Sequence, residues 1–433
     1  MNKLIVFCRR HPMWVLLAAS FAMLATIIFS KGIIHTLDTQ SYIGTWDNAI
    51  SHGHVDNART PVYPILFGIG KMLVGDAHCE IFVIIVQIIV FYASALIFRK
   101  MIFALVPNRR AAWLTVSVLF LFYPIINYLN VLGTEPLSFS FTALFMYSVW
   151  RFLKHPSWKY GIAVTLLIVL EIMLRPAMLI LVVVIVLLAV AGVFIRQYRR
   201  AALLLLLTLI PIGIIYQIYT AKVEELTGVH TLSTVGTINN YYIARQYNDI
   251  FPEYLVDNPA ALDMMKRYQE AVDPAAKEYD GKLYNEIVEA LTDGILTYKQ
   301  MDDYARQVRD NHPGKWLQYM FKRIGRSLRS DGPVKTWCND LIVLFYTIAF
   351  LTVWIRRHTF SLINFLTLMM GGGSLISVWL FAQLEFGRLM LPTSAVLILM
   401  GGQLLGCIHM RRRRLHLSLK DFTPDKKASE HSI

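Results

Sequence analysis

Long apolar runs alternate with short polar connections along most of this chain. Each run holds about 20 residues, which is the length that an α-helix needs to cross the hydrocarbon core of a bilayer. The pattern therefore predicts an all-α polytopic membrane protein with about ten transmembrane helices. The expected crossings lie over residues 12–30, 81–98, 111–129, 137–153, 160–174, 177–195, 201–219, 337–355, 359–382 and 389–410.

Two segments between these runs are too polar to cross a membrane and too long to be simple turns. Residues 31–80 contain a short helix that should open at Asp38 and an apolar stretch over residues 62–74, which is too short to span. We expect that stretch to lie in the membrane interface. Residues 220–336 form the soluble-looking part of the chain, with helices expected over residues 260–271, 282–296, 301–309 and 316–328.

The same pattern divides the chain into four parts, and the basic residues indicate which side each part faces. The parts are an N-terminal membrane region, an outer helical segment, a C-terminal membrane region and a basic tail, over residues 1–219, 220–336, 337–410 and 411–433. Lys and Arg gather in the connections on the side of the N-terminus. Because cytoplasmic loops carry the excess of positive charge, both termini should be cytoplasmic, and residues 31–80 and 220–336 should face outward.

The composition agrees with a membrane location. The 433 residues are 56% hydrophobic and 16% charged, and the net charge is +13. Because the positive charge gathers in short connections between apolar runs, it favours membrane orientation over nucleic-acid binding. The first apolar run is longer than a signal-peptide core and lacks a small-residue cleavage site, so we expect it to remain as a helix.

The cysteines and the closely spaced histidines do not predict a metal site. Four cysteines lack metal-ligand spacing and are expected to be unpaired buried thiols, with a disulfide between Cys79 and Cys338 as the alternative. His52 and His54 lack a fixed third ligand, so we expect them to be solvated.

Charged residues at the outer ends of the predicted crossings are the candidates for chemistry. Asp38 closely follows the first crossing, where a partly desolvated carboxylate can act as a general base. The alternative is that Asp38 serves only as the N-cap of the next helix. Arg59, Arg175 and Arg388 also lie on the outer side, against the charge bias of the loops. Their guanidinium groups either bind a lipid phosphate or extend to the headgroups.

Two glutamates and two tyrosines complete the candidate site. Glu135 and Glu385 stand at the outer ends of predicted helices. Because a carboxylate at that depth needs a partner, each should either pair with an arginine or bind a hydroxyl group of a sugar or acceptor. Tyr42 and Tyr63 belong to the same outer loop as Asp38, and we assign them to sugar or acceptor binding.

The order of these motifs resembles that of the GT-C-type glycosyltransferases, polytopic enzymes that use polyprenyl-phosphate sugars and include protein O-mannosyltransferases and the aminoarabinose transferase of lipid A. The resemblance covers roughly residues 1–220 and the last two crossings. Many members carry adjacent acids in the first motif, whereas here Thr39 follows Asp38. The matching elements are Asp38 with Tyr42, Arg59-x-Pro61-x-Tyr63-Pro64, Thr134-Glu135-Pro136, Leu174-Arg175-Pro176 and Gly387-Arg388-x-x-x-Pro392.

The resemblance implies inverting transfer of a sugar from a polyprenyl-phosphate donor to a hydroxyl of a lipid, glycan or protein. The reaction would take place on the outer face of a bacterial-type cytoplasmic membrane, among its lipids. Asp38 would be the general base, and Arg59 and Arg388, with Arg175 as a third candidate, would bind the donor phosphate as its charge grows. A divalent cation is the one cofactor that this chemistry leaves open.

Two other function classes share these features. A flippase for lipid-linked oligosaccharides would also need arginines in a helix bundle, but it should carry charged residues near the middle of its crossings. A polymerase or ligase of surface polysaccharide would share the substrate chemistry and the large outer segment.

Overall fold

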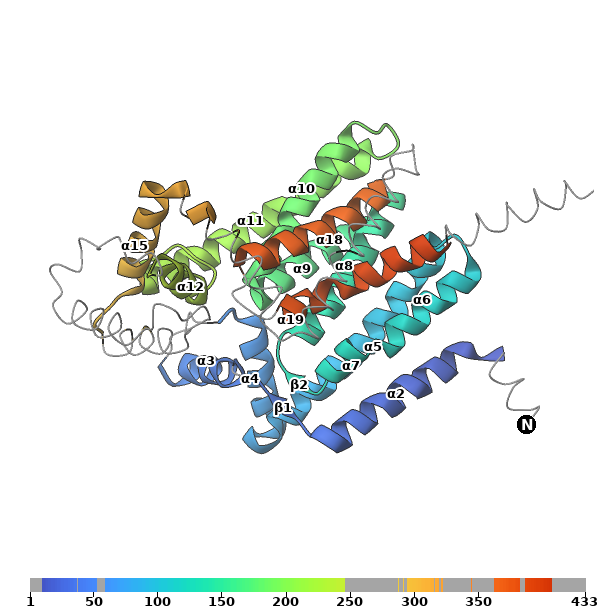
Figure 1. Ribbon diagram of the computed structural model, residues 1–433, viewed down its shortest axis with the longest axis horizontal. Coiled ribbons are helices and arrows are strands. Elements are labelled where there is room, and N and C mark those ends of the chain that lie inside the picture. Colours follow the sequence, from blue (N-terminus) through green and yellow to red (C-terminus); the bar gives the residue numbers. More distant parts are fainter. Residues whose placement is uncertain are drawn as a thin grey trace, which may run out of the picture.

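The structure, a computed structural model, is almost entirely helical where it describes the chain (Figure 1). The described residues are 10–36, 38–52, 59–245, 294–314, 316–318, 362–381 and 386–406, together with Ile287, Leu291, Phe321 and Leu344. The strands in these ranges form one short parallel pair, β1 (Ile34–His35) with β2 (Val131–Leu132).

Short connections join the helices between residues 10 and 245, and further helices follow in the C-terminal half. In chain order, the helices are α2 (Pro12–Lys31), α3 (Thr39–His52), α4 (Val62–Val74), α5 (Cys79–Leu105), α6 (Arg109–Leu121), α7 (Tyr123–Tyr128), α8 (Glu135–Lys154), α9 (Trp158–Leu174), α10 (Ile180–Val193), α11 (Arg199–Thr227), α12 (Thr234–Arg245), α15 (Tyr298–Asn311), α18 (Leu362–Phe381) and α19 (Phe386–Met390).

Six helical segments in the described residues are long and apolar enough to cross a membrane, which is compatible with an integral membrane protein. They correspond to six of the predicted crossings. They are Pro12–Lys31, Asp76–Leu105, Arg109–Tyr128, Pro176–Val193, Arg199–Thr227 and Arg388–Gly406.

The other predicted crossings do not all reach that length and hydropathy. α8 and α9 form helices over the predicted runs 137–153 and 160–174, but α9 has 17 residues and α8 carries polar side chains along its length. α18 forms a helix of 20 residues within the predicted run 359–382. Of residues 337–355 the structure describes Leu344 alone, so the count of ten stays a prediction.

α8 lies at the centre of the helix bundle, and this position explains its lower hydropathy. It packs against α5 and α9, and most of its side chains are buried, including the polar Ser138, Ser140 and Thr142. A helix that does not face lipid can carry such groups when partners inside the bundle satisfy them. By contrast, α5 and α11 expose large apolar side chains such as Ile89 and Ile218, as expected of surfaces that face lipid.

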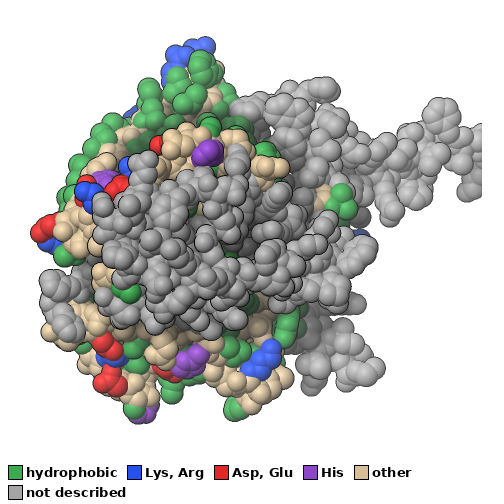
Figure 2. Space-filling view, turned by 60° about the vertical axis from the view of Figure 1, so that its left-hand side comes forward, with side chains coloured by type: hydrophobic (Ala, Val, Ile, Leu, Met, Phe, Trp, Pro, Cys, Tyr) green, Lys and Arg blue, Asp and Glu red, His purple; other side chains and the backbone are tan. Residues whose placement is uncertain are grey.

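The two ends of the bundle differ in structure and charge. Figure 1 shows α3, α4, α12 and α15 at one end, while the connections α5–α6 and α10–α11 lie at the other. The second end carries the basic residues of the predicted cytoplasmic loops, among them Arg109 and Arg199. With the first end turned forward, acidic, basic and histidine side chains appear along its edges (Figure 2). This arrangement fits the predicted alternation of loops, although which end faces the cytoplasm stays a prediction.

The short helices of residues 31–80 form where the sequence pattern expects them. α3 begins at Thr39, directly after Asp38, and α4 has the expected bounds Val62–Val74. Cys79, at the start of α5, is buried and unpaired, as expected. The other three cysteines lie outside the described residues.

In the described parts of residues 220–336, the helices differ from expectation in where they begin and end. α11 continues past the predicted end of its crossing to Thr227, because the helix stops only where Gly228 adopts a left-handed conformation. The expected helix over 282–296 does not reach its predicted end, because the chain turns at Gly294. α15 confirms the helix expected over 301–309 and begins earlier, since Thr297 caps it in a capping box with Gln300. The expected helix over 260–271 and most of that over 316–328 lie outside the described residues.

Candidate functional site

The segments that carry Asp38 and Glu135 are joined before their helices begin. Strand β1, just before Asp38, pairs in parallel with β2, just before Glu135. Thr39 strengthens this link, because its Oγ1 donates a hydrogen bond to the carbonyl of Leu132 at 2.9 Å. The starts of α3 and α8 are therefore fixed beside each other although they lie far apart in the sequence.

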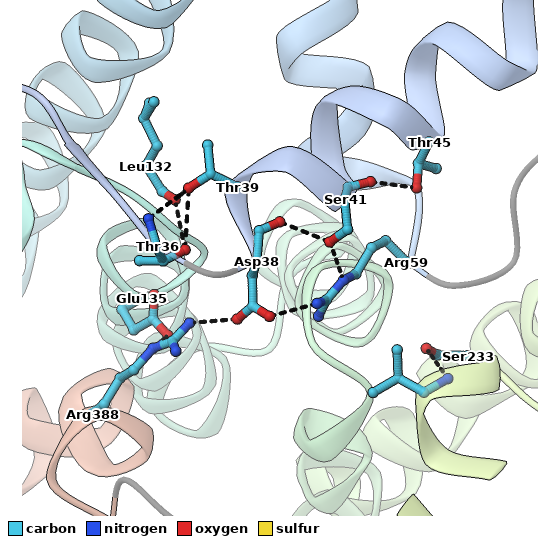
Figure 3. Close-up of polar contacts among 11 residues, drawn as sticks. Thr36, Asp38, Thr39, Ser41, Thr45, Arg59, Leu132, Glu135, Ser233 and Arg388 are labelled. Carbon is cyan, nitrogen blue, oxygen red and sulfur yellow. Dashed lines mark hydrogen bonds and ion pairs between the residues drawn. The ribbon is translucent and has the colours of Figure 1, made fainter. Parts of the chain in front are cut away.

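Asp38 uses both of its carboxylate oxygens to bind arginines (Figure 3). Oδ1 accepts a hydrogen bond from Nη2 of Arg59 at 2.5 Å, and Oδ2 accepts one from Nη2 of Arg388 at 2.7 Å. The carbonyl oxygen of Asp38 accepts from the backbone N–H of Tyr42 at 3.2 Å, so the residue does stand at the N-cap position. Its side chain, however, has a second role, because it bridges two cations.

Arg59 is held in place by the first turn of α3. Its Nε donates to Oγ of Ser41 at 2.7 Å, and its guanidinium group lies over the ring of Tyr42, 5.0 Å from the ring centre. Ser41 in turn donates to the carbonyl of Asp38 at 2.7 Å. Three residues of one helix start therefore orient the guanidinium group.

Arg388 connects Asp38 to Glu135. Its Nε donates to Oε1 of Glu135 at 2.7 Å, while its Nη2 binds Asp38. Nη1 of Arg175 lies 3.3 Å from the same glutamate oxygen. The five residues thus form one row, in the order Arg59, Asp38, Arg388, Glu135 and Arg175, which we call the charge row. Its three guanidinium groups and two carboxylates leave one excess positive charge.

The members of the charge row differ in their access to a substrate. The Glu135 side chain is 1% exposed, and its Oε2 is a buried atom without a hydrogen-bond partner. Gly133 packs so closely against Oε2 that a side chain at this position would collide with it. Asp38 is 28% exposed and Arg59 is 20% exposed. Glu135 is therefore placed to hold arginines, and Asp38 and Arg59 are placed to contact a ligand.

The two predicted tyrosines lie one behind the other. Tyr42 contacts Tyr63 edge to face, with 4.8 Å between the ring centres, and Tyr63 is completely buried. The hydroxyl of Tyr63 donates to Oε1 of Gln87 at 2.7 Å, and Nε2 of Gln87 donates to the carbonyl of Val131 at 3.1 Å. In this arrangement Tyr63 supports Tyr42, and through it Arg59, from behind.

The charges around Asp38 set its protonation. Burial raises the pKa of Asp38, but the guanidinium groups of Arg59 and Arg388 lower it by more, so the net pKa lies below its ordinary value. Burial also raises the pKa of Tyr42, so its hydroxyl stays protonated at neutral pH. Asp38 is therefore an anion at neutral pH, fully engaged with two cations.

Sequence reasoning missed two polar residues inside predicted crossings. Gln87 lies in the run 81–98 and connects Tyr63 to the strand pair. Glu171 lies in the run 160–174, is fully buried, and accepts hydrogen bonds from Ser138 at 2.7 Å and Thr142 at 2.8 Å. The sequence does contain a signal for both residues. Each is an isolated polar residue in an apolar run, and such a residue needs a buried partner.

The structure brings together most of the predicted site residues. Glu385 lies outside the described residues, as does His54. In the part of the chain that the structure describes, no three His, Cys, Asp or Glu side chains gather closely enough to hold a metal ion. Comparisons with protein-family models and with curated proteins give no match to this chain.

Proposed function

We propose that this protein is an integral membrane glycosyltransferase that moves a sugar from a polyprenyl-phosphate donor to an acceptor hydroxyl. The observation that supports it most directly is the bridge that Asp38 makes between Arg59 and Arg388. This places a carboxylate, the group needed as a base, beside guanidinium groups, which suit a phosphate leaving group. The motif resemblance to GT-C-type glycosyltransferases supports the same reaction.

The reaction is a single displacement. Asp38 takes the proton of the acceptor hydroxyl, and the acceptor oxygen forms a bond to the anomeric carbon of the sugar as the bond from that carbon to the phosphate oxygen breaks. The electron pair of the broken bond stays on the phosphate, which leaves as polyprenyl phosphate. The proton then passes from Asp38 to solvent. Attack opposite the leaving group inverts the anomeric configuration.

The charge of the row matches this reaction. Its excess of one positive charge balances the single negative charge of a phosphodiester donor. When Asp38 gains a proton, the row gains one positive charge, and the departing phosphate monoester gains one negative charge. The site therefore stays neutral while charge moves, and the guanidinium groups stabilise the negative charge that develops on the leaving phosphate.

The proposal assigns an orientation to the helix bundle. The end with α3, α4 and the charge row faces outward, where the phosphate of a donor lies at the headgroup depth of a bacterial-type cytoplasmic membrane. Ten crossings, with both termini in the cytoplasm, would bring the C-terminal segment that carries Arg388 to the same face. The membrane holds the polyprenyl chain, and a lipid, glycan or protein supplies the hydroxyl.

A flippase for the same lipid-linked sugar is the second candidate function. Glu171 favours it, because a buried carboxylate inside a helix bundle is typical of transporters.

The experiment that tests the glycosyltransferase against the flippase is a transfer assay. It uses the purified protein in lipid vesicles, a radiolabelled polyprenyl-phosphate sugar and an extract of envelope acceptors. Label should pass from the lipid to the acceptor. Movement of the intact lipid-linked sugar across the membrane, with no release of sugar, would instead establish the flippase.

A further inference from the structure

We propose that the carboxylate of Asp38 and the phosphate of the donor compete for the same two guanidinium groups, those of Arg59 and Arg388, so that donor binding releases Asp38. The inference rests on the proposed function, because it describes how that site is regulated. The ligand class is a phosphate ester, and the base would act only after such an ester has bound.

The competition follows from which atoms Asp38 occupies. Its carboxylate spans the two arginines, with one oxygen on Nη2 of each (Figure 3). Phosphate oxygens bind guanidinium groups in the same way as carboxylate oxygens, through short charge-assisted hydrogen bonds. A phosphate that lies between Arg59 and Arg388 in the place of the Asp38 carboxylate would bind these same Nη2 groups.

Each of the two arginines has a further anchor besides the carboxylate of Asp38. Nε of Arg59 is held by Ser41 at 2.7 Å, and Nε of Arg388 is held by Glu135 at 2.7 Å. Tyr42 supports the guanidinium group of Arg59 from one face. Both cations therefore stay in place when their Nη2 groups change partner, which makes them a preorganised clamp.

Asp38 is the member of the charge row best placed to move. Its side chain is 28% exposed, whereas those of Arg59 and Arg388 are 20% and 15% exposed. Exchange of a carboxylate for a phosphodiester replaces one negative charge by another, so the clamp stays neutralised. The released carboxylate then loses the hydrogen bonds that lowered its pKa, and it becomes a stronger base. Release therefore couples donor binding to activation of the acceptor hydroxyl.

The first experiment measures the affinity of purified protein in detergent for farnesyl phosphate, a short polyprenyl phosphate without a sugar, by calorimetry. Asp38→Asn should bind it about tenfold more tightly than wild type, because the variant loses the charge-assisted hydrogen bonds of the competing carboxylate. The matched control is Asp47→Asn, which removes a carboxylate that pairs with Lys71 away from the charge row. The control should bind like wild type.

The second experiment uses the wild-type protein, so it does not depend on how the variant folds, and it separates competition from simple charge repulsion. A water-soluble carbodiimide with an added amine labels accessible carboxyl groups, and peptide mass spectrometry quantifies the label on Asp38. Farnesyl phosphate should increase labelling of Asp38 severalfold, because binding releases the carboxylate. An equal increase with inorganic phosphate would assign the exchange to the phosphate group alone, and an increase limited to farnesyl phosphate would assign it to a lipid phosphate.

The outcomes separate this inference from the proposed function. Unchanged affinity of Asp38→Asn, or reduced labelling of Asp38 on addition of farnesyl phosphate, would overturn the exchange even if sugar transfer is observed. Tighter binding and increased labelling without any sugar transfer would support the exchange and refute the glycosyltransferase. If the Asn variant does not fold, the labelling result on wild type decides.

Discussion

Nε of Arg388 donates a hydrogen bond to Oε1 of Glu135 at 2.7 Å, which joins the C-terminal membrane segment to the start of α8. The same oxygen lies 3.3 Å from Nη1 of Arg175, at the end of α9. The buried carboxylate of Glu135 thus positions the guanidinium groups of Arg388 and Arg175, which come from different helices. The geometry of the proposed phosphate clamp therefore depends on Glu135, whose side chain is 1% exposed.

The first prediction concerns that carboxylate. Glu135→Gln should lower the free energy of unfolding by about 3 kcal/mol, because it removes the buried counter-charge that Arg175 and Arg388 share. Thermal unfolding in detergent measures the effect. The control is Glu80→Gln, which alters a half-exposed pair with His35 and should change stability by less than about 0.5 kcal/mol. Equal stability of both variants would show that Glu135 does not anchor the arginines.

The second prediction concerns the base. Asp38→Asn should reduce the rate of sugar transfer by about 10² to 10⁴, since that is the usual contribution of a general base and the amide is nearly isosteric. Transfer from a polyprenyl-phosphate sugar is the measurement, and Asp47→Asn is again the control. If Asp38→Asn transfers sugar at the wild-type rate, Asp38 is not the general base and serves only as the N-cap of α3.

The third prediction concerns acid pH. Arg59 and Arg388 face the carboxylate of Asp38 directly, and Tyr42 and Glu135 lie beside it. Because its pKa is lowered in the folded state from the ordinary value of 3.8, Asp38 should stabilise the protein fully above about pH 4 and lose this effect as the pH falls further.

The measurement is the difference in unfolding temperature between wild type and Asp38→Asn, followed from pH 7 to pH 3. Groups that titrate in both proteins cancel from this difference. It should stay constant to about pH 4 and shrink only below it. A difference that already shrinks between pH 7 and pH 5 would place the pKa of Asp38 above its ordinary value and contradict the ion pairs.

The sequence predicts that Asp38, Arg59 and Arg388 lie at helix ends on one side of the membrane, because each is a charged residue beside an apolar run. It does not indicate that one carboxylate bridges both arginines. Arg388 follows Asp38 by 350 positions, and only the packing of the bundle and the β1–β2 pair brings the two together. Tertiary contacts at this separation leave no periodic signal in a single sequence.

The count of crossings shows a different limit. Apolar length predicts a lipid-facing helix well, and six of the predicted crossings meet that criterion. α8 does not, because its polar side chains are satisfied inside the bundle, where Ser138 and Thr142 both donate to Glu171. Average hydropathy cannot distinguish such a central helix from a weak membrane segment. Gln87 and Glu171 were missed for the same reason, since each was averaged into an apolar run.

The fourth prediction concerns sidedness. In a protein whose four native cysteines are replaced by serine, Lys299→Cys on α15 should react with an impermeant maleimide added to intact cells. Gln197→Cys, in the basic connection between α10 and α11, should react only after the membrane is opened. Both positions are exposed, so accessibility does not favour either one. The reverse labelling pattern would place the charge row on the cytoplasmic face and remove the basis for an outward-facing site.

The last prediction separates a phosphate clamp from arginines that only extend to headgroups. In Arg388→Lys, a single ammonium group cannot reproduce the two directions in which Arg388 binds Asp38 and Glu135. Arg59→Lys likewise loses either the bond to Asp38 or the bond to Ser41. Both variants should therefore lower sugar transfer.

The loss should be larger in kcat than in the affinity for the donor, because the phosphate gains its second negative charge only as the bond to the sugar breaks. The control is Arg151→Lys on α8, whose guanidinium group binds Tyr160 outside the charge row and should tolerate the change. An arginine that interacts only with headgroups keeps its function as lysine, since the charge is retained. If Arg59→Lys and Arg388→Lys both transfer sugar at the wild-type rate, the clamp is refuted. A fall in kcat in both lysine variants, with little change in donor affinity, would instead show that the two arginines act on the leaving phosphate.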